Sequence, residues 1–312
     1  MKDFSFFEAH PEQRETFGFE PSLFHRVDHL LLQSTTGWRW YFAKSERTGK
    51  VVASLYLNIR DGKANSAVRS PFGTIECSET ISPETLYNFL QFVDEKLKRS
   101  NVTYVEIKCS PVAYAPNANT MILTFLSNLG YSIKLAEVTT CLAVDHDFVN
   151  ALSKVKKYSL QRSKVMGLEF RILPLEWMET IYKFIEQAHQ TKGYVLSMEY
   201  GKLHETANRF PEDFILSGIF ENKSLVSASV AVKVDKNILY HFYVNHAASR
   251  SKISPVLMIH EGLYNYCKTN GMKLFDLGTS AFSGMPNFGL LSFKMRLGAI
   301  PSTKLTLEKF LP

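Results

Sequence analysis

Two stretches of the chain repeat the same order of apolar and polar positions. One reads SPETLYNFLQFVDEKLKRSNVTYVEIK from Ser82, and the other reads SPVLMIHEGLYNYCKTNGMKLFDLG from Ser254. Apolar residues recur in each at intervals of three or four, which predicts a helix with one buried face. A Ser-Pro pair suits each helix start, because serine caps free N–H groups and proline tolerates the first helical position. The runs VTYVEIK and MKLFDL then predict a strand after each helix.

β-rich runs precede both helices at a nearly constant distance. KVVASLYLNIRDGK reaches Asp61, and SLVSASVAVKVDKN reaches Asp235. Both are typical of strands that enter a tight turn. The order of strands, helix and strand therefore occurs twice, and we predict two similar α/β domains, residues 1–147 and 148–312.

Composition places the chain among globular proteins. It has 312 residues, of which 45% are hydrophobic and 21% charged. The N-terminal residues carry acids where a signal peptide would be basic, and no apolar run approaches the ~20 residues of a membrane span. We therefore expect a cytoplasmic protein without a membrane-inserted segment. Its four cysteines show no CxxC spacing and are expected to be reduced and structural.

Positive charge is concentrated in the second half of the chain. Residues 1–147 carry a net charge of −2 and residues 148–312 a net charge of +8. Five cations lie in the segment 149–167 without an acid: Lys154, Lys156, Lys157, Arg162 and Lys164. This segment is either a solvated helix or a surface for phosphates. The asymmetry favours a partner or substrate with phosphates or carboxylates.

One lysine lies at an unexpected position in FGLLSFKMRLGA, residues 288–299. On a helix, Lys294 falls inside an apolar arc made of Leu290, Leu291, Phe293, Met295 and Leu297. Either its methylene stem lies along apolar surface and the charge reaches water, or the ammonium meets a bound anion. Asp276 ends an apolar strand just before a small-residue loop. It could pair with Lys294, or both could line one cleft.

Polar candidates also surround the helix that starts at Ser254. Arg250 and Lys252 precede its N-terminus, where free N–H groups favour an anion. His241 and Tyr243 are two residues apart on a predicted strand, which places them on the same side. They could act in proton transfer or simply pack in the core.

Two further features are weighed as candidates from their residues. The loop from Gln190 to Tyr200 joins two helical patterns, and it could close over an acceptor or be an ordinary connection. His25 and His29 could share a helix face, but HRVDH lacks the glutamate of HExxH, so no metal site is expected.

These residues carry a resemblance to a known family. The series Arg250, Ser254-Pro255, Gly271, Phe275-Asp276-Leu277-Gly278, Phe293-Lys294 and Gly298 resembles the C-terminal signature of FemAB-like proteins. That group belongs to the GNAT superfamily of acyltransferases. The resemblance implies two tandem GNAT-like domains, each with a mixed central sheet flanked by helices. The donor would lie where the sheet splays beside the Ser254 helix, and an acyl or aminoacyl group would pass directly to an amine acceptor.

The resemblance also implies roles for individual residues. Lys294 would bind an anion or polarise the carbonyl, and Asp276 would orient Lys294 or the amine. The donor phosphates would be held by Arg250, Lys252, Ser254 and Gly278. Acyl-CoA or aminoacyl-tRNA would serve as the donor substrate, which makes tRNA a candidate partner.

Two departures from the family pattern qualify these roles. The loop ASRSKIS has no glycine, so its backbone is not suited to wrap a pyrophosphate, and no tightly bound CoA is expected. Glu76 and Glu79 precede the first helix and would repel a phosphate, so we predict a degenerate first domain. The alternative function is a non-catalytic module that binds RNA or a phosphorylated partner through the basic half.

Overall fold

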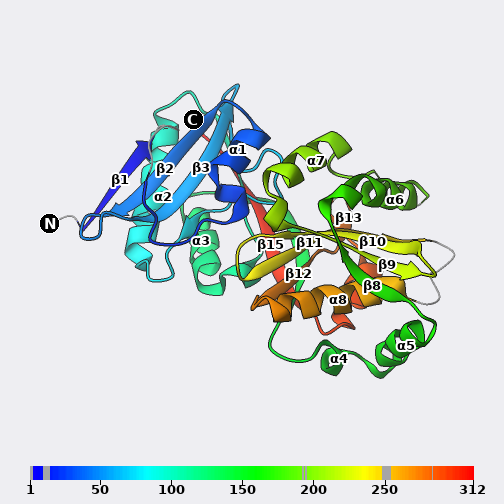
Figure 1. The fold of residues 1–312 in the computed structure, drawn as a ribbon. Helices are drawn as coiled ribbons and strands as arrows, with labels where there is room; N and C mark the ends of the chain where they lie inside the picture. The colour runs from blue at the N-terminus through cyan, green and yellow to red at the C-terminus, as the bar shows by residue number, and fades with distance from the viewer. Residues whose placement is uncertain (1–2, 10–14, 192, 194, 248–253, 283) are drawn as a thin grey trace. The chain divides into compact units, whose positions relative to one another are not determined.

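The computed structural model describes residues 3–9, 15–191, 193, 195–247, 254–282 and 284–312. The chain divides into two compact units, and each combines a β-sheet with helices (Figure 1). Residues 1–138 and 302–312 form the first unit, and residues 139–301 form the second. This division differs from the predicted one, 1–147 and 148–312, mainly because the last strand of the chain belongs to the first unit.

The first unit has a mixed sheet. Its strands are β1 (Phe4–Ala9), β2 (Trp38–Ser45), β3 (Val51–Arg60), β4 (Lys63–Asn65), β5 (Glu76–Cys77), β6 (Tyr104–Lys108), the start of β7 (Ser132–Ala143) and most of β15 (Ile300–Phe310). They lie in the order β1-β2-β3-β4-β6-β15-β7, and β5 pairs with β3. The β4–β6 pair is parallel, whereas β6 and β15 are antiparallel.

Helices and 3-10 turns complete this unit. They are a turn at Leu23–His25, α1 (Val27–Gln33), α2 (Pro83–Lys98), a turn at Val112–Tyr114, and α3 (Pro116–Asn128). Apolar residues of α2, such as Leu86 and Phe89, share a core with Val105 and Ile107 of β6. The predicted turn after Asp61 is a two-residue hairpin in which Asp61 and Gly62 have φ values of 49° and 71°. Such turns match the twist of paired strands, and Gly62 adopts this conformation without strain.

The second unit also has a mixed sheet, in the order β7-β12-β11-β10-β9-β8. Its strands are β8 (Glu169–Leu173), β9 (Phe214–Glu221), β10 (Ser224–Lys233), β11 (Ile238–His246) and β12 (Leu274–Thr279), with the end of β7 and the small pair β13 (Ala281–Phe282) and β14 (Met285–Pro286). Its helices are α4 (Phe148–Ala151), α5 (Lys154–Val165), α6 (Met178–Gln190), α7 (Tyr200–Arg209), α8 (Pro255–Thr269) and α9 (Phe288–Met295), with 3-10 turns at Leu175–Trp177 and Pro211–Asp213. Helices α6 and α8 cover opposite faces of this sheet (Figure 1).

The predicted repeat is visible in the order of elements. In each half a parallel strand pair, β4–β6 or β11–β12, brackets a helix that starts at a Ser-Pro pair. The final strand of each half of the sequence then pairs with a strand from the other half. After α3, the end of β7 pairs with β12 of the second unit, and after α9, β15 pairs with β6 of the first. Each sheet is therefore completed by a strand from the other half of the sequence.

A helix that spans a bilayer needs about 20 mostly apolar residues. Among the described residues, no helix is both long and apolar enough to cross a membrane.

Candidate functional site

The sheet of the second unit opens between β11 and β12. These parallel strands pair only from Ile238–Tyr240 to Leu274–Asp276. Beyond that point β11 continues to His246, still paired with β10, while β12 runs to Thr279 beside β7. Among the described residues, no strand pairs with this side of β11 after Tyr240. This is the splay that the family resemblance predicts beside α8.

A bulge in β11 changes which way its side chains face. Ala231 pairs with His241 and Val230 with Tyr243, so Phe242 is an extra residue in β11. An extra residue shifts the alternation of side chains by one. His241 therefore faces α8 while Tyr243 faces α6. The prediction that both lie on the same side is wrong, because it assumed an uninterrupted strand.

His241 is buried in a cluster of polar and aromatic side chains. Its Nε2 lies 2.7 Å from Ser229 Oγ, and its ring meets that of His260 edge-on at a centroid distance of 5.0 Å. Burial, with His260 and Lys294 nearby, holds the pKa of His241 well below its ordinary value of 6.5. His241 is therefore neutral at physiological pH and a weak base.

His260 of α8 was not identified from the sequence. Its Nδ1 lies 2.7 Å from the carbonyl oxygen of Val256, so Nδ1 carries the proton and Nε2 is the acceptor. Burial lowers the pKa of His260 to about 4. In the sequence, a histidine on the apolar face of a helix cannot be told from an ordinary core histidine. The contact between His260 and His241 is visible only once β11 is placed against α8.

Tyr243 connects β11 to the segment before α7. Its hydroxyl lies 2.8 Å from Ser197 Oγ and accepts a hydrogen bond from the Met198 N–H at 2.9 Å. Burial raises the pKa of Tyr243, so the phenol stays protonated. The loop predicted as a possible cover, Gln190–Tyr200, does join α6 to α7, although residues 192 and 194 lie outside the described residues.

The end of β12 is held by two charged side chains. Asp276 Oδ1 accepts hydrogen bonds from Thr139 Oγ1 at 2.8 Å and from the Gly278 N–H at 2.7 Å. Lys294 Nζ donates to the carbonyl oxygens of Gly278 at 2.8 Å and Thr279 at 2.9 Å. We call Asp276, Gly278, Thr279 and Lys294 the strand-end clamp. It fixes the residues of β12 that have left β11.

Lys294 is the residue that α9 buries most. Lys294 is 5% exposed, whereas Leu290 and Met295 are 37% and 49% exposed. The ammonium is thus largely shielded from water, contrary to the interpretation in which the charge reaches solvent, and its described partners are main-chain carbonyls. Burial lowers the pKa of Lys294 to about 8, while Asp276 raises it. Two of its three N–H groups are used, and the third donates to none of the described residues.

The start of α8 differs from the start of α2. Ser82 caps α2 as predicted, because its Oγ accepts the Thr85 N–H at 3.1 Å. Ser254 occupies the same position before α8 but has φ 50° and ψ 52°, and its side chain makes no capping hydrogen bond. The predicted serine cap is therefore wrong for α8. Arg250 and Lys252, the predicted phosphate ligands, lie outside the described residues.

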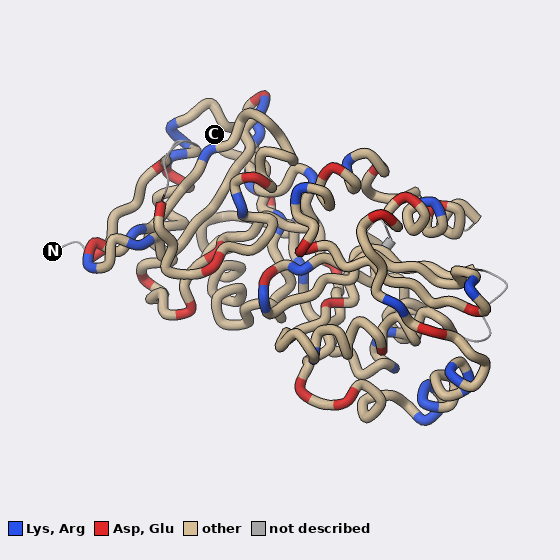
Figure 2. The backbone as a smooth tube through the Cα atoms, in the orientation of Figure 1, with Lys and Arg blue, Asp and Glu red and all other residues tan. Residues whose placement is uncertain are grey.

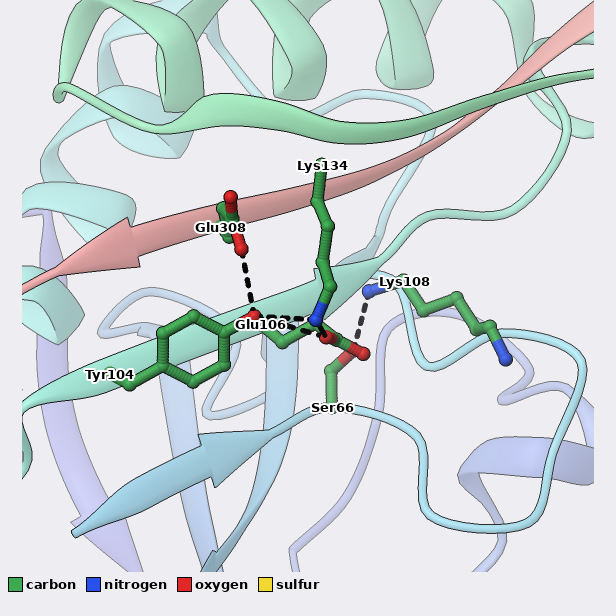
Figure 3. A network of polar contacts seen from close by, with 6 residues as sticks. All are labelled: Ser66, Tyr104, Glu106, Lys108, Lys134 and Glu308. Atoms are coloured by element: carbon green, nitrogen blue, oxygen red, sulfur yellow. Dashed lines mark hydrogen bonds and ion pairs between the residues drawn. The ribbon is translucent and has the colours of Figure 1, made fainter. Parts of the chain in front are cut away.

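In the first unit, the position that corresponds to Asp276 is occupied by Glu106, which belongs to a network of polar side chains. In the parallel pair β4–β6, Glu106 lies beside Asn65. This matches the parallel pair β11–β12, in which Asp276 lies beside Tyr240. Figure 3 shows Glu106 bound by Lys134 Nζ at 2.5 Å, and Lys134 also donates to the Tyr104 hydroxyl at 2.8 Å. That hydroxyl lies 2.9 Å from Glu308. Glu106 is thus bound by a lysine side chain, whereas Asp276 Oδ1 accepts hydrogen bonds from a hydroxyl and a main-chain N–H.

The remaining sequence candidates lie in buried contacts. Glu76 Oε2 accepts the Ser22 N–H at 3.1 Å and lies 3.3 Å from His25 Nδ1. His29 Nδ1 lies 3.2 Å from Gln33 Nε2. Within the described ranges, no cluster of three or more His, Cys, Asp or Glu side chains could hold a metal ion. Cys109, Cys141 and Cys267 are buried free thiols, and Cys77 is partly buried.

Comparison with solved structures identifies the fold. A crystal structure of FemX matches with a TM-score of 0.70 and 13% identity, over 98% of this chain and 97% of that chain. A tandem GNAT protein from the clavulanic acid biosynthesis pathway matches at 0.54 and 13% identity, over 98% of both chains. L-PGS from Bacillus licheniformis matches at 0.53 and 13% identity, over 87% of this chain and 83% of that one.

These likenesses confirm the predicted fold: two tandem GNAT-like domains, each with a mixed sheet flanked by helices. No family model and no curated protein matches the sequence.

Proposed function

We propose that this protein transfers an acyl or aminoacyl group from a phosphate-bearing donor, a CoA thioester or an aminoacyl-tRNA, directly to an amine. The observation that carries the proposal is the opening between β11 and β12, whose β12 side is fixed by the strand-end clamp. Acyl transfer needs a donor held in line with the amine, and preorganised hydrogen-bond donors at the developing oxyanion. The edge of β11 beyond Tyr240, which pairs with no described strand, supplies main-chain groups that could hold the donor in line with the amine.

The fold supports the same class of reaction. FemX and a tandem GNAT protein share it over nearly the whole chain. The shared fold of L-PGS supports an aminoacyl group as one version of the transferred unit. The uncapped start of α8 would face the donor phosphates, with Arg250 and Lys252 in the preceding loop.

Lys294 has two roles in this proposal. It holds β12 through two carbonyls, and its remaining N–H stabilises the negative charge that develops on the carbonyl oxygen in the transition state. Asp276 positions Gly278 and, through it, the same strand end. The neutral His241–His260 pair keeps further positive charge away from the amine, which must be unprotonated to attack.

The experiment has a binding stage and a turnover stage. Thermal unfolding is followed with acetyl-CoA, a long-chain acyl-CoA and aminoacyl-tRNA, and a donor that raises Tm is then supplied with its acyl group labelled. We expect label to pass to an amine acceptor with release of the free thiol or tRNA. Lys294→Met should lower kcat on the order of 10²-fold, the cost of losing one oxyanion donor. The exposed Lys202→Met is the matched control and should retain activity.

Two outcomes would contradict the proposal. If none of the three donors raises Tm, the opening does not bind them. If a donor or RNA binds with steep salt dependence but no label is transferred, the chain is the non-catalytic phosphate-binding module instead.

A further inference from the structure

Helix α5 presents large apolar side chains to solvent. Val155, Tyr158 and Val165 are 73%, 72% and 76% exposed, and Met166, which follows the helix, is 45% exposed. Their spacing of three and seven residues places them along one line of the helix. The opposite side is anchored, because Leu160 and Ser163 are buried and Leu160 belongs to the core of the second unit. The exposed apolar stripe is therefore held outward by a well-packed helix.

Lys154 and Lys157 border this stripe, and Arg162 lies within it, between Tyr158 and Val165. Lys154, Lys157 and Arg162 are exposed, and among the described residues no ion pair involves them. Lys164 instead binds Glu261 at 2.7 Å, and Lys156 turns inward over the Phe293 ring at 4.6 Å. Figure 2 shows basic positions recurring along α5, and the helix contains no acid. This face thus combines unpaired positive charge with unpartnered apolar surface.

The two features together identify the kind of partner. Positive charge alone would suit any polyanion, including RNA. Tyr158 offers one ring on which a base could stack, but Val155, Val165 and Met166 offer none, and the burial of these three is favourable only in an apolar medium. Exposed aliphatic side chains with cations beside them fit the surface of an anionic bilayer, where apolar groups enter the boundary of the acyl chains and cations meet the lipid phosphates.

We propose that α5 docks this protein onto the surface of an anionic lipid bilayer. Val155, Tyr158 and Val165 enter the boundary between headgroups and acyl chains, while Lys154, Lys157 and Arg162 lie at the lipid phosphates. This inference is independent of the proposed transfer reaction, because no residue of the strand-end clamp takes part.

The test is sedimentation of the full chain with vesicles of pure phosphatidylcholine and with vesicles that also contain phosphatidylglycerol. We expect binding to the anionic vesicles alone. The triple variant Lys154→Gln/Lys157→Gln/Arg162→Gln should bind about 100-fold more weakly, from about fivefold for each cation near the surface. The triple variant Val155→Ser/Tyr158→Ser/Val165→Ser keeps every cation and should also lose most binding.

Matched controls separate docking from general effects. Ile133→Ser removes an exposed apolar residue of the first unit, and Lys183→Gln with Lys202→Gln removes exposed cations of α6 and α7. These variants should bind like the unmodified chain. Far-UV circular dichroism and Tm should be unchanged in both α5 variants, because the altered side chains are exposed.

Three results would overturn the proposal: unmodified protein that stays in the supernatant with anionic vesicles, undiminished binding by the serine variant, or retardation of tRNA in a gel without vesicle binding. The last result would assign α5 to RNA. Transfer activity on a soluble acceptor, where it is found, should be the same in both α5 variants, so failure of docking and failure of the proposed function are distinguishable.

Discussion

The buried ammonium of Lys294 should leave a signature in the pH dependence of stability. Burial lowers its pKa in the folded protein to about 8, from the ordinary lysine value of 10.5 in the unfolded chain. Below pH 8 both states are protonated, and the folded state bears the full cost of the buried charge. Between pH 8 and 10.5 the unfolded chain binds more protons, so the free energy of unfolding rises with pH.

The magnitude follows from the two pKa values. A difference of about 2.5 at 1.36 kcal/mol per pKa unit corresponds to about 3.4 kcal/mol in total. Roughly 2 kcal/mol of this is recovered between pH 7 and pH 9.5, because the unfolded lysine is still mostly protonated at the upper limit. Neutral Lys294 retains two N–H groups, enough to donate to both Gly278 and Thr279 carbonyls.

Lys294→Met removes this titration. Urea unfolding at pH 7 and pH 9.5 should show that the stability of the unmodified protein, relative to the variant, increases by about 2 kcal/mol. Lys202→Met, which removes an exposed lysine, controls for the general loss of a cation. A difference that is the same at both pH values would mean that the ammonium is solvated in the folded protein, and the account of the strand-end clamp would fail.

Three further predictions follow from the same structure. Ser82→Ala should lower the free energy of unfolding by about 1 kcal/mol, whereas Ser254→Gly should raise it by up to about 1 kcal/mol, because Ser82 caps its helix and Ser254 has a positive φ; urea unfolding measures both. Gly278→Ala should cost about 1–2 kcal/mol because φ is +76°, while Gly201→Ala in an open helical position should be neutral or stabilising in the same assay. Tyr243→Phe should cost about 1–3 kcal/mol and speed proteolysis of the segment before α7, since the Met198 N–H loses its acceptor; an unchanged cleavage rate would contradict that link.

Local signals in the sequence were enough for much of the fold. The Ser82 cap, the hairpin at Asp61 and Gly62, and the helix from Pro255 all depend on neighbouring residues, which a single sequence displays. The Phe242 bulge has no such signal. The bulge depends on how β10 and β11 pair. A rule that assigns alternate residues to one face of a strand therefore put His241 and Tyr243 on the same face, whereas in the structure they lie on opposite faces.

The helix α9 shows why the site itself was harder to predict. Counting apolar positions puts Met295 in the buried arc, but Met295 is half exposed and Lys294 is buried. An analysis of apolar periodicity predicts that a lysine side chain extends to solvent. Two carbonyls at the end of β12 need donors instead, and that requirement arises only once β12 has folded. Asp276 and Lys294 both contact Gly278, and this shared contact is visible only in three dimensions.

The strands that complete the two sheets constrain how this chain could have been inherited. A gene cut after codon 147 would give one product without the strand beside β6, and a second product without the strand beside β12. Each product would expose a long unsatisfied sheet edge, a known route to aggregation. The two halves of the sequence are therefore not separable at residue 147 without loss of a strand that each sheet needs.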